Sequence, residues 1–409
     1  MNSQNKLKII NDPIYGFITI PSSIIFELIE HRYFQRLRRI SQMGMSYLVY
    51  PGAHHTRFQH AIGAMHLMQK AVQTLIFKGV KISTEESEAL YIAILLHDIG
   101  HGPFSHAMEH SIVEGIDHES ISLLFMSELN KEFNNRLTLA IQIFSDNYHR
   151  NFFYQLISGQ LDMDRLDYLK RDSFYTGVSE GSINSERLIS MLNVVADKLV
   201  VEEKGIYSVE KFIIARRLMY WQVYLHKTSL VAEQLLTRLL KRAKYLVTNG
   251  VDINASKHLS FFLNCSITKK SINSEILDEF ANLDDNDIIS AMKSWQYEDD
   301  FVLSNISKML LNRELLKIEI QIEEFDREYL SESKQKLMAR YSITDEEASY
   351  FVFKGQITNQ AYSMKKETID LYTKQGKTID VANASDHFNL KALSKKVVKN
   401  YMCYPKTNN

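Results

Sequence analysis

Histidine is concentrated in one part of this 409-residue chain, where side chains that bind metals and transfer protons recur at short spacing. Nine of the 14 histidines lie within residues 54–118. Inside that window, residues 89–98 (ALYIAILLHD) form an apolar run that ends in His97 and Asp98, and residues 99–106 (IGHGPFSH) follow it. A carboxylate buried beside an imidazole needs compensation, because an unpaired charge is costly to remove from water. A bound cation would supply it: imidazole with carboxylate suits Fe, Mn, Zn or Ni, whereas carboxylate alone would suit Mg.

The elements around this pair must bring further ligands to it, because two adjacent ligands make an incomplete site. The apolar run predicts a helix that the following GHGP segment ends, which places both ligands at its carboxyl end. Upstream, Thr56 and Gln59 have the spacing of a capping box and predict the start of a second helix. Arg57 and His60 would then share one face of that helix, so His60 is a candidate ligand.

Two later segments present polar side chains at helical spacing. In residues 160–172 (QLDMDRLDYLKRD), every fourth residue from 164 onward places a carboxylate, a phenol and a second carboxylate on one face. The residues are Asp164, Tyr168 and Asp172. In residues 215–227 (ARRLMYWQVYLHK), a second face combines positive charge with aromatic rings. Its residues are Arg216, Tyr220, Tyr224 and Lys227. The first face could complete a metal site, and the second could bind a phosphorylated ligand.

The composition excludes several classes of protein. With 45% hydrophobic and 24% charged residues, the chain has the profile of a globular protein, and disordered or collagen-like architectures are excluded. The formal net charge of -1 implies no overall attraction to nucleic acid or anionic membrane. Cys265 and Cys403 show no pairing pattern, so we expect no structural disulfide. No run of 18 apolar residues or export signal is seen, and we expect a cytoplasmic protein.

Periodicity predicts a mainly α fold. Helical patterns dominate residues 22–249, preceded by a hairpin between strands at 7–10 and 17–20, and a second hairpin is predicted at 198–207. Weaker periodicity at 248–274 suggests two parts, residues 1–248 and a smaller α+β region at 249–409. In the second part we expect helix over 284–311, strands at 318–322 and 351–353, and an exposed helix or connector at 323–336.

The motifs together resemble one known family, the HD-superfamily phosphohydrolases, and most closely its deoxynucleoside triphosphate triphosphohydrolases. The family pattern is a His, then an adjacent His-Asp pair, then a distant Asp. NDPIYG, FQRLRRISQMG, YPGAHHTRFQHAIG, LLHDIGHGPFSH, DHE and LDMDRLDYLKRD occur here in the family's order, over about the first 230 residues. The fold that the resemblance implies is a helical HD-domain core with short β-hairpins.

The resemblance also implies roles for individual residues. The metal ligands would be His60, His97, Asp98 and Asp164. The residues at the α-phosphate and the reacting phosphorus would be Arg57, His101, His106 and His118. A metal ion can polarise a phosphoryl oxygen or lower the pKa of water, and a nearby histidine can protonate the leaving 5′-oxygen. His118 with Glu119 is a candidate acid held by a carboxylate, and Asp117 is a candidate helix N-cap.

The same resemblance implies a substrate site and partners. Arg165, Tyr168 and Arg216 would bind the β- and γ-phosphates, Tyr224 would pack by the sugar or base, and Gln42 and Asp172 would contact the sugar hydroxyl. Related enzymes often form homo-oligomers with an activating nucleotide between subunits. Residues at comparable positions here are Lys8, Asn11, Glu30, Gln35 and Arg38. We therefore expect a homo-oligomer and consider an allosteric nucleotide.

The leading functional hypothesis is hydrolysis of deoxynucleoside triphosphates to deoxynucleoside and triphosphate, with one divalent metal ion (Fe, Mn, Zn, Ni or Mg) and additional Mg on the substrate triphosphate. The nearest alternative is a phosphohydrolase of this superfamily that acts on a nucleoside monophosphate, a cyclic nucleotide or a guanosine alarmone. A nucleotide-binding regulator with little turnover is a third hypothesis. We expect no membrane or nucleic-acid partner.

Overall fold

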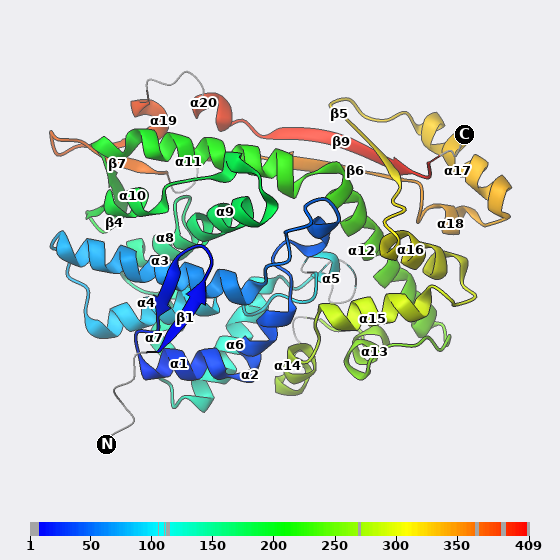
Figure 1. Ribbon diagram of the computed structural model, residues 1–409, viewed down its shortest axis with the longest axis horizontal. Coiled ribbons are helices and arrows are strands. Elements are labelled where there is room, and N and C mark those ends of the chain that lie inside the picture. Colours follow the sequence, from blue (N-terminus) through cyan, green and yellow to red (C-terminus); the bar gives the residue numbers. More distant parts are fainter. Residues whose placement is uncertain are drawn as a thin grey trace.

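The computed structural model shows a mainly helical molecule with three small sheets (Figure 1). It describes residues 8–104, 106–109, 111, 115–268, 271–364, 368–385 and 390–406, with the side chains of residues 106, 109, 391 and 392 left aside. The helices are α1 (Ser23–Glu30), α2 (Arg32–Gln35), α3 (Arg57–Phe77), α4 (Thr84–Leu96), α5 (His106–Glu109), α6 (His118–Glu132), α7 (Thr138–Phe144), α8 (Asn151–Ser158), α9 (Met163–Thr176), α10 (Ser185–Ser190), α11 (Ile206–Met219), α12 (Lys227–Thr248), α13 (Lys257–Asn264), α14 (Ser274–Ala281), α15 (Asp285–Trp295), α16 (Phe301–Leu311), α17 (Arg327–Tyr341), α18 (Asp345–Ala348), α19 (Val381–Ala384) and α20 (Leu390–Leu393). The expected mainly α fold with a C-terminal α+β region is confirmed.

The strands form small sheets around the helical core. They are β1 (Ile9–Asp12), β2 (Gly16–Thr19), β3 (Leu192–Val195), β4 (Lys198–Glu202), β5 (Lys317–Gln321), β6 (Phe353–Asn359), β7 (Asp370–Tyr372), β8 (Thr378–Asp380) and β9 (Val397–Tyr404). The strand orders are β1-β2, β3-β4-β7-β8 and β5-β9-β6, and among the strands of the described residues every pairing is antiparallel except the parallel pair β4 and β7. The N-terminal hairpin is present, with its first strand two residues later than expected.

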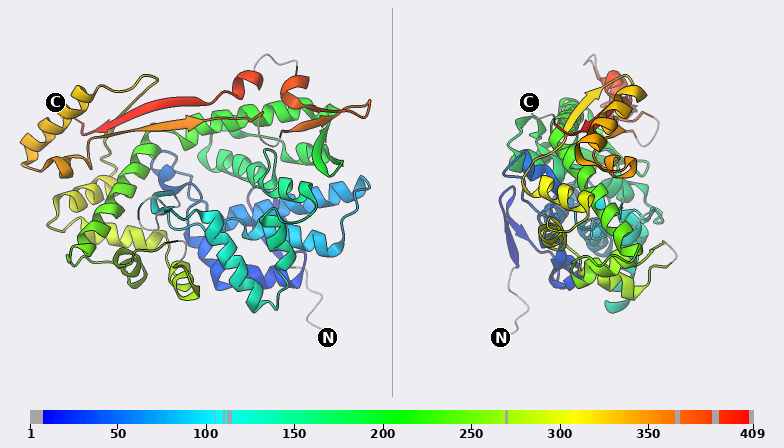
Figure 2. Two further views of the ribbon diagram at one scale, coloured as in Figure 1. Left: turned by 180° about the vertical axis from the view of Figure 1, so that it is seen from behind. Right: turned by 90° about the vertical axis from the view of Figure 1, so that its right-hand side faces the viewer.

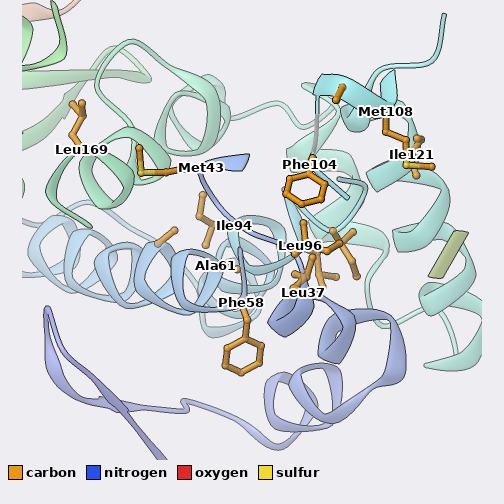
Figure 3. Close-up of a cluster of buried hydrophobic side chains, with 14 of the residues drawn as sticks. Leu37, Met43, Phe58, Ala61, Ile94, Leu96, Phe104, Met108, Ile121 and Leu169 are labelled. Atoms are coloured by element: carbon orange, nitrogen blue, oxygen red, sulfur yellow. The ribbon is translucent and has the colours of Figure 1, made fainter. Parts of the chain in front are cut away.

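The core that positions the site is built from α3, which packs against α4 and against α9. Figure 3 labels Phe58 and Ala61 of α3 and Ile94 and Leu96 of α4 among the buried apolar side chains of this core. These four side chains are at most 3% exposed. The sequence specifies this packing because α4 is apolar around its whole circumference from residue 89 to 96, as a helix enclosed by others must be.

The predicted second hairpin at 198–207 was wrong in its partner. β4 is a strand, but it pairs with the preceding β3 through a two-residue turn at Ala196 and Asp197. Both turn residues have positive φ, 48° and 60°, which is the geometry of a tight hairpin turn. The Glu-Glu-Lys-Gly segment instead forms a 3₁₀ turn, Glu203–Gly205, and α11 begins at Ile206.

The C-terminal region differs from expectation in its boundaries. The helix expected over 284–311 is two helices, α15 and α16, because Asp300 caps a new helix start by accepting a hydrogen bond from the Leu303 amide at 2.8 Å. The strand expected at 318–322 is present as β5, the one expected at 351–353 begins only at Phe353, and the exposed helix expected near 323–336 is α17.

The long strands β6 and β9 run side by side along the outer side of α11 and α12, as the views from front and back agree (Figure 2). Two cation–π contacts join these strands to the helices beneath them. Lys399 of β9 lies 4.0 Å from the ring centroid of Trp221, and Arg238 of α12 lies 3.4 Å from that of Phe353 in β6. Among the described residues, no helix has the length and apolar character needed to span a membrane.

Candidate metal centre and nucleotide site

Four side chains from three separate segments of the chain converge at the ends of α3, α4 and α9. The Oδ1 atom of Asp164 lies 3.1 Å from Nε2 of His60 and 3.5 Å from Nε2 of His97. Asp98 adds its carboxylate oxygens at 3.8 Å from Nε2 of His60 and 3.4 Å from Nε2 of His97. His60, His97 and Asp164 each offer a ligand atom close enough to the others to hold one metal ion, whereas Asp98 falls in a second such group with His101 and His118. Imidazole and carboxylate donors of this kind suit a divalent transition-metal ion, and Asp98 lies beside them as the expected fourth ligand.

The hydrogen bonds of the two imidazoles support this assignment. Nδ1 of His60 lies 2.7 Å from Oδ2 of Asp167, and Nδ1 of His97 lies 2.6 Å from the carbonyl oxygen of Ile94. Each bond fixes the tautomer in which Nε2 has the free lone pair. Both Nε2 atoms are buried and have no hydrogen-bond partner among the described residues. A buried nitrogen held ready in this way is what a metal ligand requires.

The electrostatics of the cluster show how strongly these charges interact. Burial disfavours the imidazolium, yet the carboxylates of Asp164 and Asp167 raise the pKa of His60 to about 10. Burial likewise opposes ionisation of Asp164, but His60 and His97 hold its pKa well below the usual range. The site therefore keeps its carboxylates ionised and attracts positive charge, as a proton or as a metal ion.

The turn after His97 is shaped by the helix behind it. Ser122 of α6 donates its hydroxyl to the carbonyl of His97 at 2.7 Å and accepts the amide of Gly100 at 2.9 Å. A Cβ atom at Gly100 would lie 2.2 Å from the carbonyl oxygen of His118, so only glycine permits this approach. The predicted N-cap Asp117 is confirmed, since its side chain accepts the Ser120 amide at 2.7 Å.

The start of α3 follows the predicted capping box. Gln59 Oε1 accepts the Thr56 amide at 2.8 Å. Arg57, in the first turn, donates from Nη1 to Oδ2 of Asp98 at 2.5 Å. The helix start thus brings a guanidinium to the edge of the ligand cluster, where a phosphate oxygen could also receive it.

The candidate catalytic histidines lie on the other side of Asp98. Nε2 of His101 is 3.3 Å from Oδ1 of Asp98, and the rings of His101 and His118 stack with centroids 3.9 Å apart. Burial, then the nearby Arg57 charge, lowers the pKa of His101 to about 3. Glu119 is exposed in the first turn of α6. The side chain of His106 lies outside the described residues.

The expected phosphate-binding residues form the next part of the site. Arg165 forms an ion pair with Asp162, whose pKa burial raises to about 7. The charge of Arg216 also lowers the pKa of Asp162, so both arginines act on this one carboxylate. The Nε atoms of Arg165 and Arg216 are buried and lack a hydrogen-bond partner in the part of the chain that the structure describes. An oxyanion could bind both.

Aromatic residues border the phosphate-binding part. The rings of Tyr168 and Tyr224 meet edge to face with centroids 6.1 Å apart, and Tyr220 packs against Tyr224 at 5.1 Å. Both Tyr220 and Tyr224 belong to a π-helical turn, Tyr220–Tyr224, that continues α11. Such turns are rare and occur often at functional sites. The helical face expected from residues 215–227 is therefore locally widened at its aromatic end.

Asp172 is held from two sides, and one of its partners was not assigned a role from the sequence. Tyr224 donates to Oδ2 of Asp172 at 2.8 Å, and Nε2 of His55 lies 2.7 Å from Oδ1. His55 is buried and stacks on Tyr175 with centroids 4.4 Å apart. Gln42 is expected to contact the same sugar, and its backbone N–H donates to the carbonyl oxygen of His55 at 3.0 Å. No spacing in the sequence distinguishes His55 from its neighbours.

Further supporting residues were also missed. Arg171 is fully buried and binds Asp167 through Nε at 2.9 Å and Asp12 through Nη1 at 2.7 Å. Buried Arg36 donates to the carbonyl oxygens of Ile99 and His101 at 2.9 and 2.6 Å. Arg171 holds carboxylates near the ligand cluster, and Arg36 holds the backbone there. The sequence signal for the Asp167 and Arg171 pair was their i, i+4 spacing on α9.

Comparison with known proteins agrees with this site. The model of the HD domain matches residues 57–172, and that of the HD associated region matches residues 183–260. The uncharacterized protein YwfO of Bacillus subtilis is 35% identical over 319 residues, which are 76% of this chain and 71% of YwfO. A phosphohydrolase of Bacteroides thetaiotaomicron has a crystal structure that matches with a TM-score of 0.95 and 51% identity, over 98% of this chain and 100% of that one.

The chain thus belongs to the HD-superfamily phosphohydrolases and lies near their deoxynucleoside triphosphate triphosphohydrolase group. The SAMHD1 homolog of Dictyostelium discoideum, named a deoxynucleoside triphosphate triphosphohydrolase, is 31% identical over 247 residues, or 56% of this chain and 48% of that protein. The chain therefore spans about half the length of that relative. The resemblance inferred from the ordered motifs is confirmed.

Proposed function

We propose that this protein is a metal-dependent hydrolase that cleaves deoxynucleoside triphosphates to deoxynucleoside and inorganic triphosphate. The observation that supports it most is a pair of half-buried arginines near the metal-ligand cluster, Arg165 and Arg216, whose buried Nε atoms each lack a hydrogen-bond partner among the described residues. A phosphohydrolase of a monophosphate would have no need for two such cations beyond the reacting phosphorus.

The proposed substrate position follows from the order of the side chains. The α-phosphate lies between the ligand cluster and Arg57, the β- and γ-phosphates reach Arg165, Tyr168 and Arg216, and the sugar lies by Asp172 and Gln42. When bound by His60, His97, Asp98 and Asp164, a divalent ion supplies a Lewis acid beside the α-phosphoryl group. The donor set favours Fe, Mn, Zn or Ni over Mg, and an additional Mg would accompany the triphosphate.

The chain's own residues then serve the displacement at phosphorus. Arg57 neutralises charge on the α-phosphate oxygens as a water oxygen approaches. The stacked imidazoles of His101 and His118 lie where a proton can be received from water or donated to the leaving 5′-oxygen. The carboxylate of Asp172, oriented by His55 and Tyr224, accepts a hydrogen bond from a sugar hydroxyl. His106 and Glu119 are proposed to assist the proton transfer.

Product identity tests the proposal directly. Purified protein is incubated with each of the four deoxynucleoside triphosphates, singly and mixed, with Fe, Mn, Zn, Ni or Mg, and the products are separated by chromatography. We expect deoxynucleoside and triphosphate. Orthophosphate or pyrophosphate in place of triphosphate would favour another phosphoester as substrate, and no product from any nucleotide at full metal occupancy would reject the enzyme.

Assembly and activation remain predictions within the same proposal. The residues expected around an activating nucleotide lie at β1, α1, α2 and the following 3₁₀ turn, Arg36–Arg39. Within this group Gln35 donates to the Ile29 carbonyl at 2.7 Å and accepts Arg38 Nε at 2.9 Å. Lys8 lies over the ring of Phe26, 4.1 Å from its centroid. A homo-oligomer whose rate rises with added nucleotide is the expected behaviour, and both are measured by light scattering and product release.

A further inference from the structure

Asp285, in the first turn of α15, joins two loops that border the active site. Its Oδ2 atom accepts the backbone amide of Ser41 at 2.8 Å, and its Oδ1 atom accepts that of Phe104 at 2.9 Å. The two amides are 244 and 181 residues away in the sequence. Asp285 as a whole residue is 8% exposed, so both hydrogen bonds to its carboxylate are shielded from water.

Helix capping does not explain this buried carboxylate. Asp284 is the N-cap of α15 and accepts the amide of Asn286 at 2.9 Å, while Asp287 accepts the amide of Asp284 at 2.8 Å. The helix start is therefore complete without Asp285. Burial raises the pKa of Asp285 in spite of the two amides that donate to it. A buried carboxylate costs stability unless each oxygen has a donor, and here each oxygen has one.

The first loop leads directly to residues that the proposed reaction uses. Ser41 forms an isolated antiparallel bridge with Thr56. On either side of this bridge, the Gln42 amide donates to the His55 carbonyl at 3.0 Å and the Arg57 amide donates to the Ile40 carbonyl at 3.0 Å. The position of Ser41 thus fixes the backbone of Gln42 and Arg57, and Asp285 fixes Ser41.

The second loop contains His101, one of the candidate catalytic histidines. Phe104 follows His101 by three residues and precedes His106 by two. Its φ of 46° lies in the left-handed region, which is strained for a bulky side chain and persists only where surrounding contacts enforce it. Arg36 holds the early part of this loop by its bonds to the carbonyls of Ile99 and His101. The amide bond to Asp285 holds the later part.

We propose that Asp285 is a positioning residue of the active site: its two carboxylate oxygens set the distance between the loop of Gln42 and Arg57 and the loop of His101. The α-phosphate contact and the proton-transferring imidazole of His101 are then held in one geometry by a residue outside the HD-domain match, which ends at residue 172. This role rests on the proposed function, because only a substrate between the two loops makes their spacing matter.

The replacement Asp285→Asn tests the role with little change in shape. An amide has one acceptor oxygen, so its NH2 group must face the N–H of Ser41 or that of Phe104, and one bond becomes a repulsion. We expect kcat to fall on the order of 100-fold, the effect of misplacing reacting groups by about 1 Å, with KM and metal content nearly unchanged. Deuterium uptake should rise in peptides that contain Ser41 or Phe104.

Asp278→Asn is the matched control. Asp278 of α14 also joins the C-terminal region to the N-terminal part, by accepting hydrogen bonds from Arg32 at 2.6 Å and from the Tyr33 hydroxyl. It touches neither loop, so wild-type kcat is expected. An equal loss of kcat in both variants, or wild-type kcat and deuterium uptake in Asp285→Asn, would overturn the role of Asp285.

The same measurements separate the two proposals. If the wild-type protein releases no triphosphate, the proposed substrate is wrong, and kcat is then measured on the nucleotide that product analysis identifies. Unchanged uptake at Ser41 and Phe104 in Asp285→Asn rejects the positioning role whatever the substrate is. If Asp285→Asn does not fold, Asp285→Glu keeps two acceptor oxygens: a partial loss of kcat supports the role, and wild-type kcat with wild-type uptake rejects it.

Discussion

Replacing Asp167 with asparagine separates orientation of a metal ligand from general stability. Oδ2 of Asp167 contacts Nδ1 of His60 at 2.7 Å and Nε of Arg171 at 2.9 Å, and Oδ1 accepts Nη2 of Arg171 at 3.0 Å. In Asp167→Asn, the negative charge is lost. One of the two hydrogen bonds from Arg171 is also lost, because an N–H of the new amide then faces an N–H of the guanidinium. The imidazole of His60 becomes less basic, because its Nδ1–H no longer donates to a carboxylate.

The size of each effect follows from burial. The side chains of His60, Asp167 and Arg171 are all 0% exposed, so water cannot replace the lost partner. Loss of one carboxylate from a buried arginine that keeps a second, Asp12, is expected to reduce stability by about 3 kcal/mol, the low end for a broken buried ion pair. Loss of the partner of a ligating histidine lowers metal affinity about 10- to 100-fold, or about 1.4–2.8 kcal/mol.

Asp12→Asn is the matched comparison. Asp12 contacts the same Arg171, Nη1 to Oδ2 at 2.7 Å, through an oxygen other than the one that forms its turn with Ile14 and Tyr15. Urea unfolding of the metal-free variants should show a similar loss of stability in both. Competition with a chelating dye should show weakened metal binding in Asp167→Asn alone. Equal weakening in both variants, or wild-type affinity in Asp167→Asn, would refute the reasoning.

Two further predictions address proton transfer and acid stability. His118→Ala should lower kcat on the order of 10²- to 10⁴-fold, measured by product release, while fold and metal content are kept, because His60, His97 and Asp164 form a ligand group without His118. Loss of the metal together with activity would contradict this role and would favour the second group, Asp98, His101 and His118, as ligands. Burial raises the pKa of Glu86, but bonds from the Ser83 amide, Tyr148 and Arg150 lower it below its ordinary 4.5. The stabilisation from Glu86 is therefore present above about pH 4.5 and lost as pH falls through the lower folded value. Tm measured against pH should fall less steeply on the acid side in Glu86→Gln, and parallel curves would count against it.

The elements with strong local signals were predictable from the sequence. The apolar run before His97, the capping box at Thr56 and the N-cap Asp117 each depend on residues a few positions apart, and each is present. The hairpin at 198–207 failed because partner choice is not local. The Glu-Glu-Lys-Gly segment suits a hairpin turn, but β3 lies closer in sequence to β4 through the turn at Ala196, and Ile206 packs better as the start of a helix.

The residues of the candidate site also fall into those that the sequence predicted and those that it did not. The ordered motifs identified the side chains that we propose bind the metal and the substrate, because their types and order are specific to one chemistry. The residues that hold them were missed, because a supporting contact can come from any element that packs nearby. His55 reaches Asp172 across 117 positions, and Asp285 reaches Ser41 across 244. Neither distance leaves a periodic signal in the sequence.

The structure also explains why the residues after 248 matter to a site that lies before them. Asp285 of α15 holds the two loops that flank the α-phosphate position. On another side, Lys399 of β9 packs on Trp221, inside the π-helical turn that presents Tyr224 toward Asp172. The C-terminal elements therefore contact the proposed site near the reacting phosphate and near the sugar. A movement of α15 or β9 on assembly would reach both parts of the substrate, and this gives the C-terminal region a physical means of changing turnover without contributing a ligand to the metal.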